Sequence, residues 1–112
     1  MKKYQLGEFE EIVLLTVGVL YGDAYGVAIK EEIEKRLKRK VSVGALQSAL
    51  RRMEKKGFLN SELGEATKAR GGKRKRYFKI TAFGKKALEF NMKTRIDLWG
   101  EIPDVAFQFS PC

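Results

Sequence analysis

The sequence predicts a mostly α-helical fold that carries one β-hairpin. Two observations favour this class: four segments place apolar residues at helical spacing, and residues 76–80 alternate apolar and polar side chains just after a glycine pair. At 112 residues, the chain is long enough for one modest core and too short for two. Its hydrophobic fraction of 44% is typical of a globular domain.

The first helix is expected over residues 7–20. Leu14, Leu15 and Val19 extend its apolar surface beyond a single face, so the helix is either central to the fold or covered by a second subunit. The apolar positions of its main face are Phe9, Ile12, Val13, Thr16, Val17 and Leu20.

The segment YGDAYG interrupts this pattern, and Asp23 is expected to cap a second helix. The buried stripe of that helix is Ile29, Ile33 and Leu37, which repeat every four residues. Residues 38–40 are three cations and form a short connection to the next helix.

The third helix is expected to begin after Ser42, whose hydroxyl can cap it, and to stop at Gly57. Its outward face has small residues first, then polar side chains, then cations. That order suits a helix in the DNA major groove, but it also suits an ordinary exposed helix. The inward stripe is Leu46, Ala49, Leu50 and Met53, and the outward residues are Gly44, Gln47, Ser48, Arg51 and Lys55, with Arg52 beside them.

A hairpin is expected from strands at 58–63 and 76–80, joined by a loop over 64–75. Gly71 and Gly72 read as its turn, because glycine reaches positive φ without steric cost. From Lys68 to Lys79 the segment carries seven cations and no acid.

Thr81 is expected to cap a fourth helix. Its apolar stripe either packs back on the first helix or is left free for an identical subunit, and the second alternative predicts a homodimer. Residues 101–112 contain both prolines and read as a tail. The stripe, which is the predicted dimer interface, consists of Leu88, Met92, Ile96 and Trp99.

The formal net charge of +9 favours a polyanionic partner. An enzyme is not expected, because the chain has no histidine and its single thiol, Cys112, is terminal. The acidic clusters read as solvated faces rather than catalytic pairs, and no cofactor, metal or membrane partner is expected. Lack of an internal disulfide fits a cytoplasmic location. The acidic residues concerned are Glu8, Glu10, Glu11, Glu31, Glu32 and Glu34.

The order of three helices, a strand, a cationic loop and a strand is that of a winged helix-turn-helix. Four segments in this order resemble the PadR family of bacterial transcriptional regulators: LGEFEEIVLL (6–15), YGVAIKEEIE (25–34), SVGALQSALRRMEKKGFL (42–59) and RGGKRKRYFKITAFG (70–84). The resemblance implies a dimer that binds double-stranded operator DNA, usually as a repressor, with the third helix in the major groove and the wing on the backbone or minor groove. The chain departs from many members at Gln47 and Ser48, where they carry Tyr and Pro, so the operator sequence cannot be transferred.

Three regions are therefore expected: a DNA-binding domain over 1–81, a dimerisation helix over 82–100 and a tail over 101–112. Relatives that bind flat aromatic effectors raise the hypothesis that Trp99 lines such a pocket. A protein-interaction adaptor and a non-specific DNA-coating protein remain the alternatives. The expected DNA-binding residues are Ser42, Gly44, Gln47, Ser48, Arg51, Arg52 and Lys55 in the third helix, and Arg70, Gly71, Gly72, Lys73, Arg74, Lys75 and Arg76 in the wing.

Overall fold

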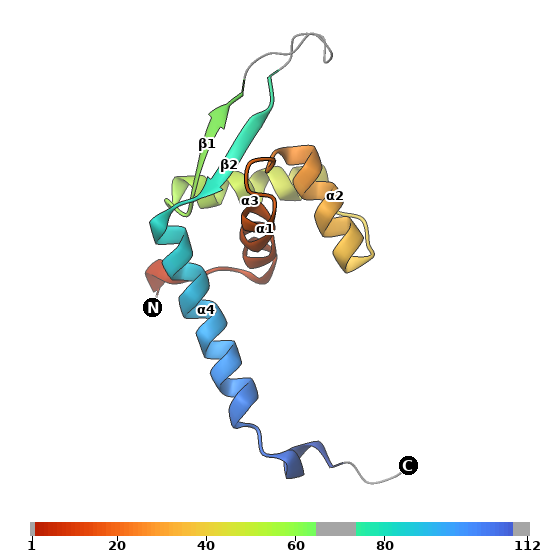
Figure 1. Ribbon diagram of the computed structural model, residues 1–112, viewed down its shortest axis with the longest axis vertical. Coiled ribbons are helices and arrows are strands. Elements are labelled where there is room, and N and C mark those ends of the chain that lie inside the picture. Colours follow the sequence, from red (N-terminus) through yellow and green to blue (C-terminus); the bar gives the residue numbers. More distant parts are fainter. Residues whose placement is uncertain (1, 65–73, 109–112) are drawn as a thin grey trace.

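A computed structural model describes residues 2–64 and 74–108. Three helices form the body of the molecule, and a two-stranded antiparallel hairpin and a long fourth helix leave it at opposite ends (Figure 1). The elements are the 3-10 helix η1 (Lys2–Tyr4), α1 (Glu8–Val19), α2 (Gly26–Leu37), α3 (Val43–Lys55), β1 (Leu59–Leu63), β2 (Arg76–Ile80), α4 (Ala82–Glu101) and the 3-10 helix η3 (Asp104–Phe107). The predicted class, mostly α with a hairpin wing and a carboxy-terminal helix, is confirmed.

The core joins the inward stripes of the three body helices to the base of the hairpin. Ile29 and Ile33 of α2 are buried as predicted, while Leu37 packs at its edge. Phe58, Phe78 and the start of α4 close the core. The buried residues of α1 and α3 are Val13, Leu14 and Val17, and Leu46, Ala49, Leu50 and Met53.

Two of the predicted caps are present. Ser42 Oγ accepts a hydrogen bond from the Ala45 N–H at 3.2 Å, and Thr81 Oγ1 accepts one from the Gly84 N–H at 2.9 Å. Gly57 ends the α3 segment with a φ of 89°, a conformation that favours glycine.

The expected cap at Asp23 is wrong. The residue that precedes α2 is Tyr25, which makes no side-chain cap hydrogen bond. Residues 24 and 25 instead pair with β2, since the Phe78 N–H donates to the Ala24 carbonyl at 2.8 Å and Tyr25 bridges Tyr77. This pairing holds the chain extended past Asp23, so the helix begins later.

The reading of Glu10 and Glu11 as solvated is also wrong, although Glu8 is exposed. Both carboxylates are buried, because the first turn of α1 lies between α3 and α4. Glu10 accepts from the Gly7 N–H at 3.0 Å and from Arg52 Nε at 3.0 Å. Glu11 pairs with Arg95 Nη1 of α4 at 2.6 Å. Adjacent carboxylates of one helix thus hold two different helices.

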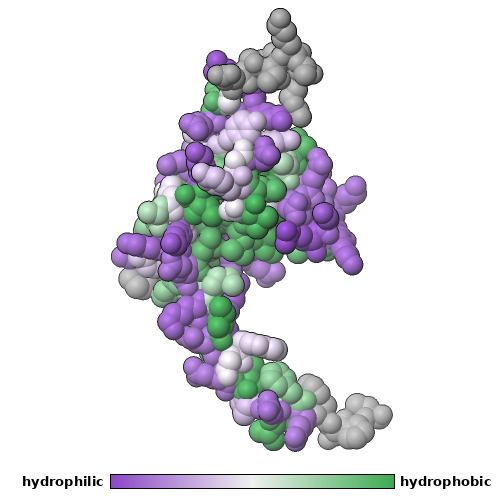
Figure 2. Space-filling view, viewed as in Figure 1, coloured by the Kyte–Doolittle hydropathy of each residue, from purple (hydrophilic) through white to green (hydrophobic). Residues whose placement is uncertain are grey.

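The predicted stripe of α4 divides between the two alternatives. Its amino-terminal half packs on the body: Leu88 contacts the core and Asn91 Nδ2 donates to the Tyr4 carbonyl at 2.9 Å. Met92 is half-buried, and every residue from 93 to 101 is exposed, with Ile96 at 60% and Trp99 at 70%. The carboxy-terminal half projects away from the body with apolar side chains uncovered (Figures 1 and 2).

Candidate nucleic-acid interface

The outward face of α3 is exposed to solvent. Gly44, Gln47, Ser48, Arg51 and Lys55 are all exposed, while the opposite stripe is buried. Adding a Cβ at Gly44 would meet nothing closer than the Ser42 hydroxyl at 3.7 Å, so the fold does not require glycine there. A small residue at this position leaves the backbone open to close approach by a partner.

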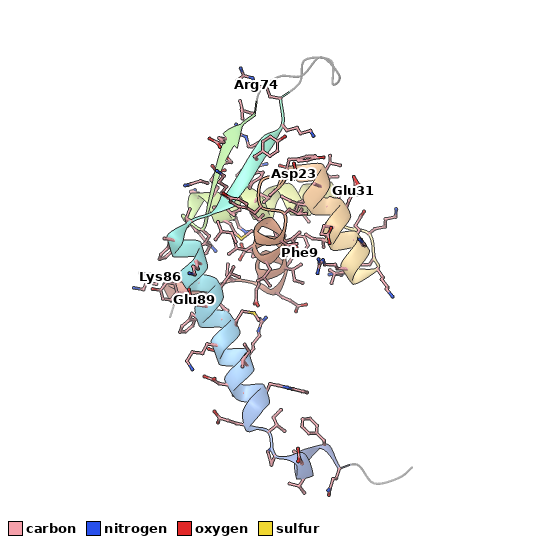
Figure 3. The ribbon with its side chains drawn as sticks, in the orientation of Figure 1. Phe9, Asp23, Glu31, Arg74, Lys86 and Glu89 are labelled. Atoms are coloured by element: carbon pink, nitrogen blue, oxygen red, sulfur yellow. The ribbon has the colours of Figure 1, made fainter. Side chains whose placement is uncertain are left out.

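The cations in the described part of the wing have different surroundings. Arg74 is exposed at the upper end of the hairpin (Figure 3), and Lys75 Nζ lies 3.9 Å from the centroid of the Tyr25 ring. Arg76 Nη1 donates to Ser61 Oγ at 2.9 Å, so the Arg76 guanidinium lies against the neighbouring strand β1. Of the expected wing residues, Arg70, Gly71, Gly72 and Lys73 lie outside the described residues.

A cleft of about 680 Å³ connects these two surfaces. We call it the wing cleft. It runs between the start of α2, the first turns of α3 and the start of β2, and thus brings Gln47 together with Arg74, Lys75 and Arg76. The residues that line it are Tyr25, Gly26, Val27, Lys30, Val43, Leu46, Gln47, Arg74, Lys75, Arg76 and Phe78.

Arg52, which lies beside the outward face of α3, is partly engaged within its own chain. Its Nε binds the buried Glu10 carboxylate, and Lys56 Nζ lies 4.0 Å from the same carboxylate. Burial acts to raise the pKa of Glu10, but hydrogen bonds from the Gly7 N–H and Arg52, with the charges of Lys56 and Arg52, outweigh it and hold the pKa below its usual 4.5. Arg52 therefore links α3 to α1.

This lowered pKa predicts an acid-dependent loss of stability. A carboxyl whose pKa is depressed by folding stabilises the fold above its unfolded pKa and stops doing so as pH falls through the folded value. We expect Glu10→Gln to cost about 1 to 2 kcal/mol at pH 7. The difference from the parent should shrink as pH falls from about 5 to 3. Thermal melts across this range check it, and a constant difference would contradict the pairing.

The turn that leads into α3 is held by one carboxylate. Glu34 Oε2 accepts from the Val41 N–H at 2.8 Å and from Lys30 Nζ at 3.0 Å. The Val41 hydrogen bond, aided by Lys30, keeps the pKa of Glu34 below its ordinary value. Glu34 therefore ties the turn before α3 to α2, and the exposed cations Lys38, Arg39 and Lys40 lie in this turn.

Sequence reasoning missed the contribution of α2 to this surface. Tyr25, Val27 and Lys30 line the wing cleft, and the edge of the Tyr25 ring system meets Tyr77 at a centroid distance of 5.8 Å. The segment YGV, at the start of the second helix, was a usable signal. The sequence also shows the run of three cations at 38–40, just before the Ser42 cap.

The described part of the chain holds neither a metal cluster nor a membrane-spanning helix. Across residues 2–64 and 74–108, no three potential metal-ligating side chains gather to hold an ion. No helix in this part of the chain is long and apolar enough to cross a membrane.

Comparisons with known proteins point in one direction. The profile of the transcriptional regulator PadR-like family matches residues 14–90. A PadR family transcription regulator from Clostridium difficile R20291 is similar at 27% identity, with 80% of this chain and 91% of that chain covered and a TM-score of 0.60. A PadR-like transcription factor from Bacteroides fragilis is similar at 25% identity, covering 80% and 82%, with a TM-score of 0.67.

A third structure, a PadR family regulator from Eggerthella lenta DSM 2243, shares the fold at 23% identity. The match covers 87% of this chain and 82% of that one, with a TM-score of 0.66. No curated protein matches the chain.

Proposed function

This chain belongs to the PadR-like family of DNA-binding transcriptional regulators, and we propose that it acts as a homodimeric repressor on a palindromic operator. The observation that carries the proposal is the wing cleft. It places the amide of Gln47 and the cations of the wing on one continuous surface. A surface of this kind can read base edges and hold phosphates at the same time.

The two parts of the surface have different roles in the proposal. Gln47, Ser48 and Arg51 read bases, because they are exposed on a rigid helix and carry groups that pair with base edges. The cations of the wing neutralise phosphates. Arg74 and Lys75 carry this role more directly than Arg76, whose guanidinium is engaged by Ser61.

Replacing Gln47 or Arg51 with Ala should weaken the preferred site by roughly 1–3 kcal/mol and relax base preference at one position. Binding to random duplex DNA should change little. Selection of tight binders from a random duplex pool, followed by footprinting, supplies the operator for this measurement. Unchanged base preference in both variants would contradict the assignment.

The same selection separates the proposal from its alternatives. A specific regulator should prefer its operator over bulk DNA by about a thousandfold or more. A DNA-coating protein would bind both alike, and a protein adaptor would bind neither tightly. Half-sites should be spaced by about 10 bp or a multiple of it, since the two recognition helices of a dimer follow the helical repeat.

The proposed dimer rests on the uncovered apolar residues of α4 and α1. Ile96 and Trp99 project from the helix over residues 82–100, and Leu15 and Val19 of α1 are also exposed, at 39% and 60%. Exposed apolar area of this kind favours a second subunit. In this arrangement residues 1–81 form the DNA-binding domain, and residues 82–100 form the helix that pairs with the second subunit.

Trp99 also supports a hypothesis about regulation. Its ring lies 5.7 Å from that of Phe107, so two subunits would bring aromatic faces together, where a small flat effector could stack. A saturable quench of the fluorescence of Trp99, the one tryptophan in the sequence, by planar cationic or phenolic compounds is the expected result. No quench across a broad panel would leave Trp99 with a packing role alone.

A further inference from the structure

Two exposed valines flank the candidate base-reading amide. Val27, in the first turn of α2, is 58% exposed, and Val43, which opens α3, is 59% exposed. Both line the wing cleft with Gln47, over a floor that includes Leu46 and Phe78. The cleft is therefore apolar at its walls and floor and cationic at its wing side.

The Gln47 amide lies close to both helix starts that carry the valines. A Cβ added at Gly26 would lie 3.3 Å from Nε2 of Gln47, so the amide lies against the residue that precedes Val27. Val43 and Gln47 are four residues apart on α3 and share one side of the helix, about 6 Å apart along its axis.

We infer that Val27 and Val43 form an apolar seat for a thymine 5-methyl group beside an adenine bound by Gln47, so that the operator half-site holds an A·T-rich step at this place. The inference rests on the proposed function. The major groove has one apolar substituent, the thymine methyl, and adenine is the base whose N6 and N7 match a glutamine amide. Cytosine has only a hydrogen at C5, where thymine has its methyl, so it would leave the seat between the valines empty.

Charge commits the cleft to DNA rather than to a neutral ligand. Arg74, Lys75 and Arg76 line its wing side, where the backbone of the duplex would lie when the base edges face α3. In this arrangement a thymine methyl lies against the valines, and neighbouring phosphates of the DNA lie against the cations.

The test removes single methyl groups from the DNA. Each thymine of the selected operator is replaced in turn by deoxyuridine, which keeps every hydrogen bond and loses the methyl. We expect the substitution to lower the affinity of the protein about fourfold at one or two positions in each half-site. This is the change expected when the burial of one methyl group is lost. At those positions Val43→Ala or Val27→Ala should bind thymine and deoxyuridine operators almost equally.

Val105→Ala is the matched control, because it trims an exposed valine of η3 that neither lines the cleft nor belongs to the proposed dimer interface. It should keep the thymine preference, and all three variants should melt as the parent does. Operators insensitive to deoxyuridine at every position, or a preference that both cleft variants retain, would overturn the inference and leave the proposed function intact. Failure to find any preferred operator would overturn both.

Discussion

Replacing Lys73, Arg74 and Lys75 together with Ala is expected to flatten the salt dependence of DNA binding. If each cation touches a phosphate, the slope of log K against log salt should fall by about 3 per wing, because binding releases the counterions that each contact displaces. Affinity for the operator and for bulk DNA should drop together. Titrations of both DNAs between low and physiological salt give the slope.

A matched variant separates contact from net charge. Lys85, Lys86 and Lys93 are exposed on α4 and lie away from the wing cleft. Replacing these three with Ala removes the same charge and should leave the slope nearly unchanged. If the slope of log K against log salt falls equally in both variants, the wing acts only through overall charge. A change in the preferred bases of the wing variant would contradict its phosphate role.

Replacing Ile96 and Trp99 together with Glu is expected to convert a dimer into monomers. Burying unpaired carboxylates in an apolar interface costs several kcal/mol, which exceeds what a modest interface supplies. Sedimentation at micromolar concentration gives the oligomeric state. Operator affinity should fall steeply in the same variant, because each monomer reaches one half-site.

The structure decides which residues this test uses. Leu88 belongs to the predicted interface stripe but packs against the core of its own chain, so a charge there would also destabilise the body and confuse the two effects. Thr94 is exposed on the opposite side of α4, and Thr94→Glu is the control that should remain dimeric. A parent protein that sediments as a monomer, or a dimer that survives both glutamates, would contradict the assembly.

Much of the candidate interface could be predicted from the sequence because it depends on local patterns. The stripe of α3 and its Ser42 cap determine which residues face outward, and the alternation over 76–80 gave the bounds of β2 correctly. Arg52 shows the limit of such patterns. It lies beside the outward face by helical spacing, yet its guanidinium is bound to Glu10, a residue 42 positions away.

The sequence alone determined the fold class, the order of the elements and the outward residues of α3, because each follows from periodicity and caps within a few residues. The tertiary structure alone decided which polar groups are covered. Glu10 and Glu11 look solvated in a helix considered by itself and become buried links once α3 and α4 pack on either side. Likewise, the wing cleft exists only because β2 pairs with the residues before α2 and brings Tyr25, Val27 and Gln47 beside the wing. Contacts between distant segments depend on how whole faces pack, and no local spacing encodes that.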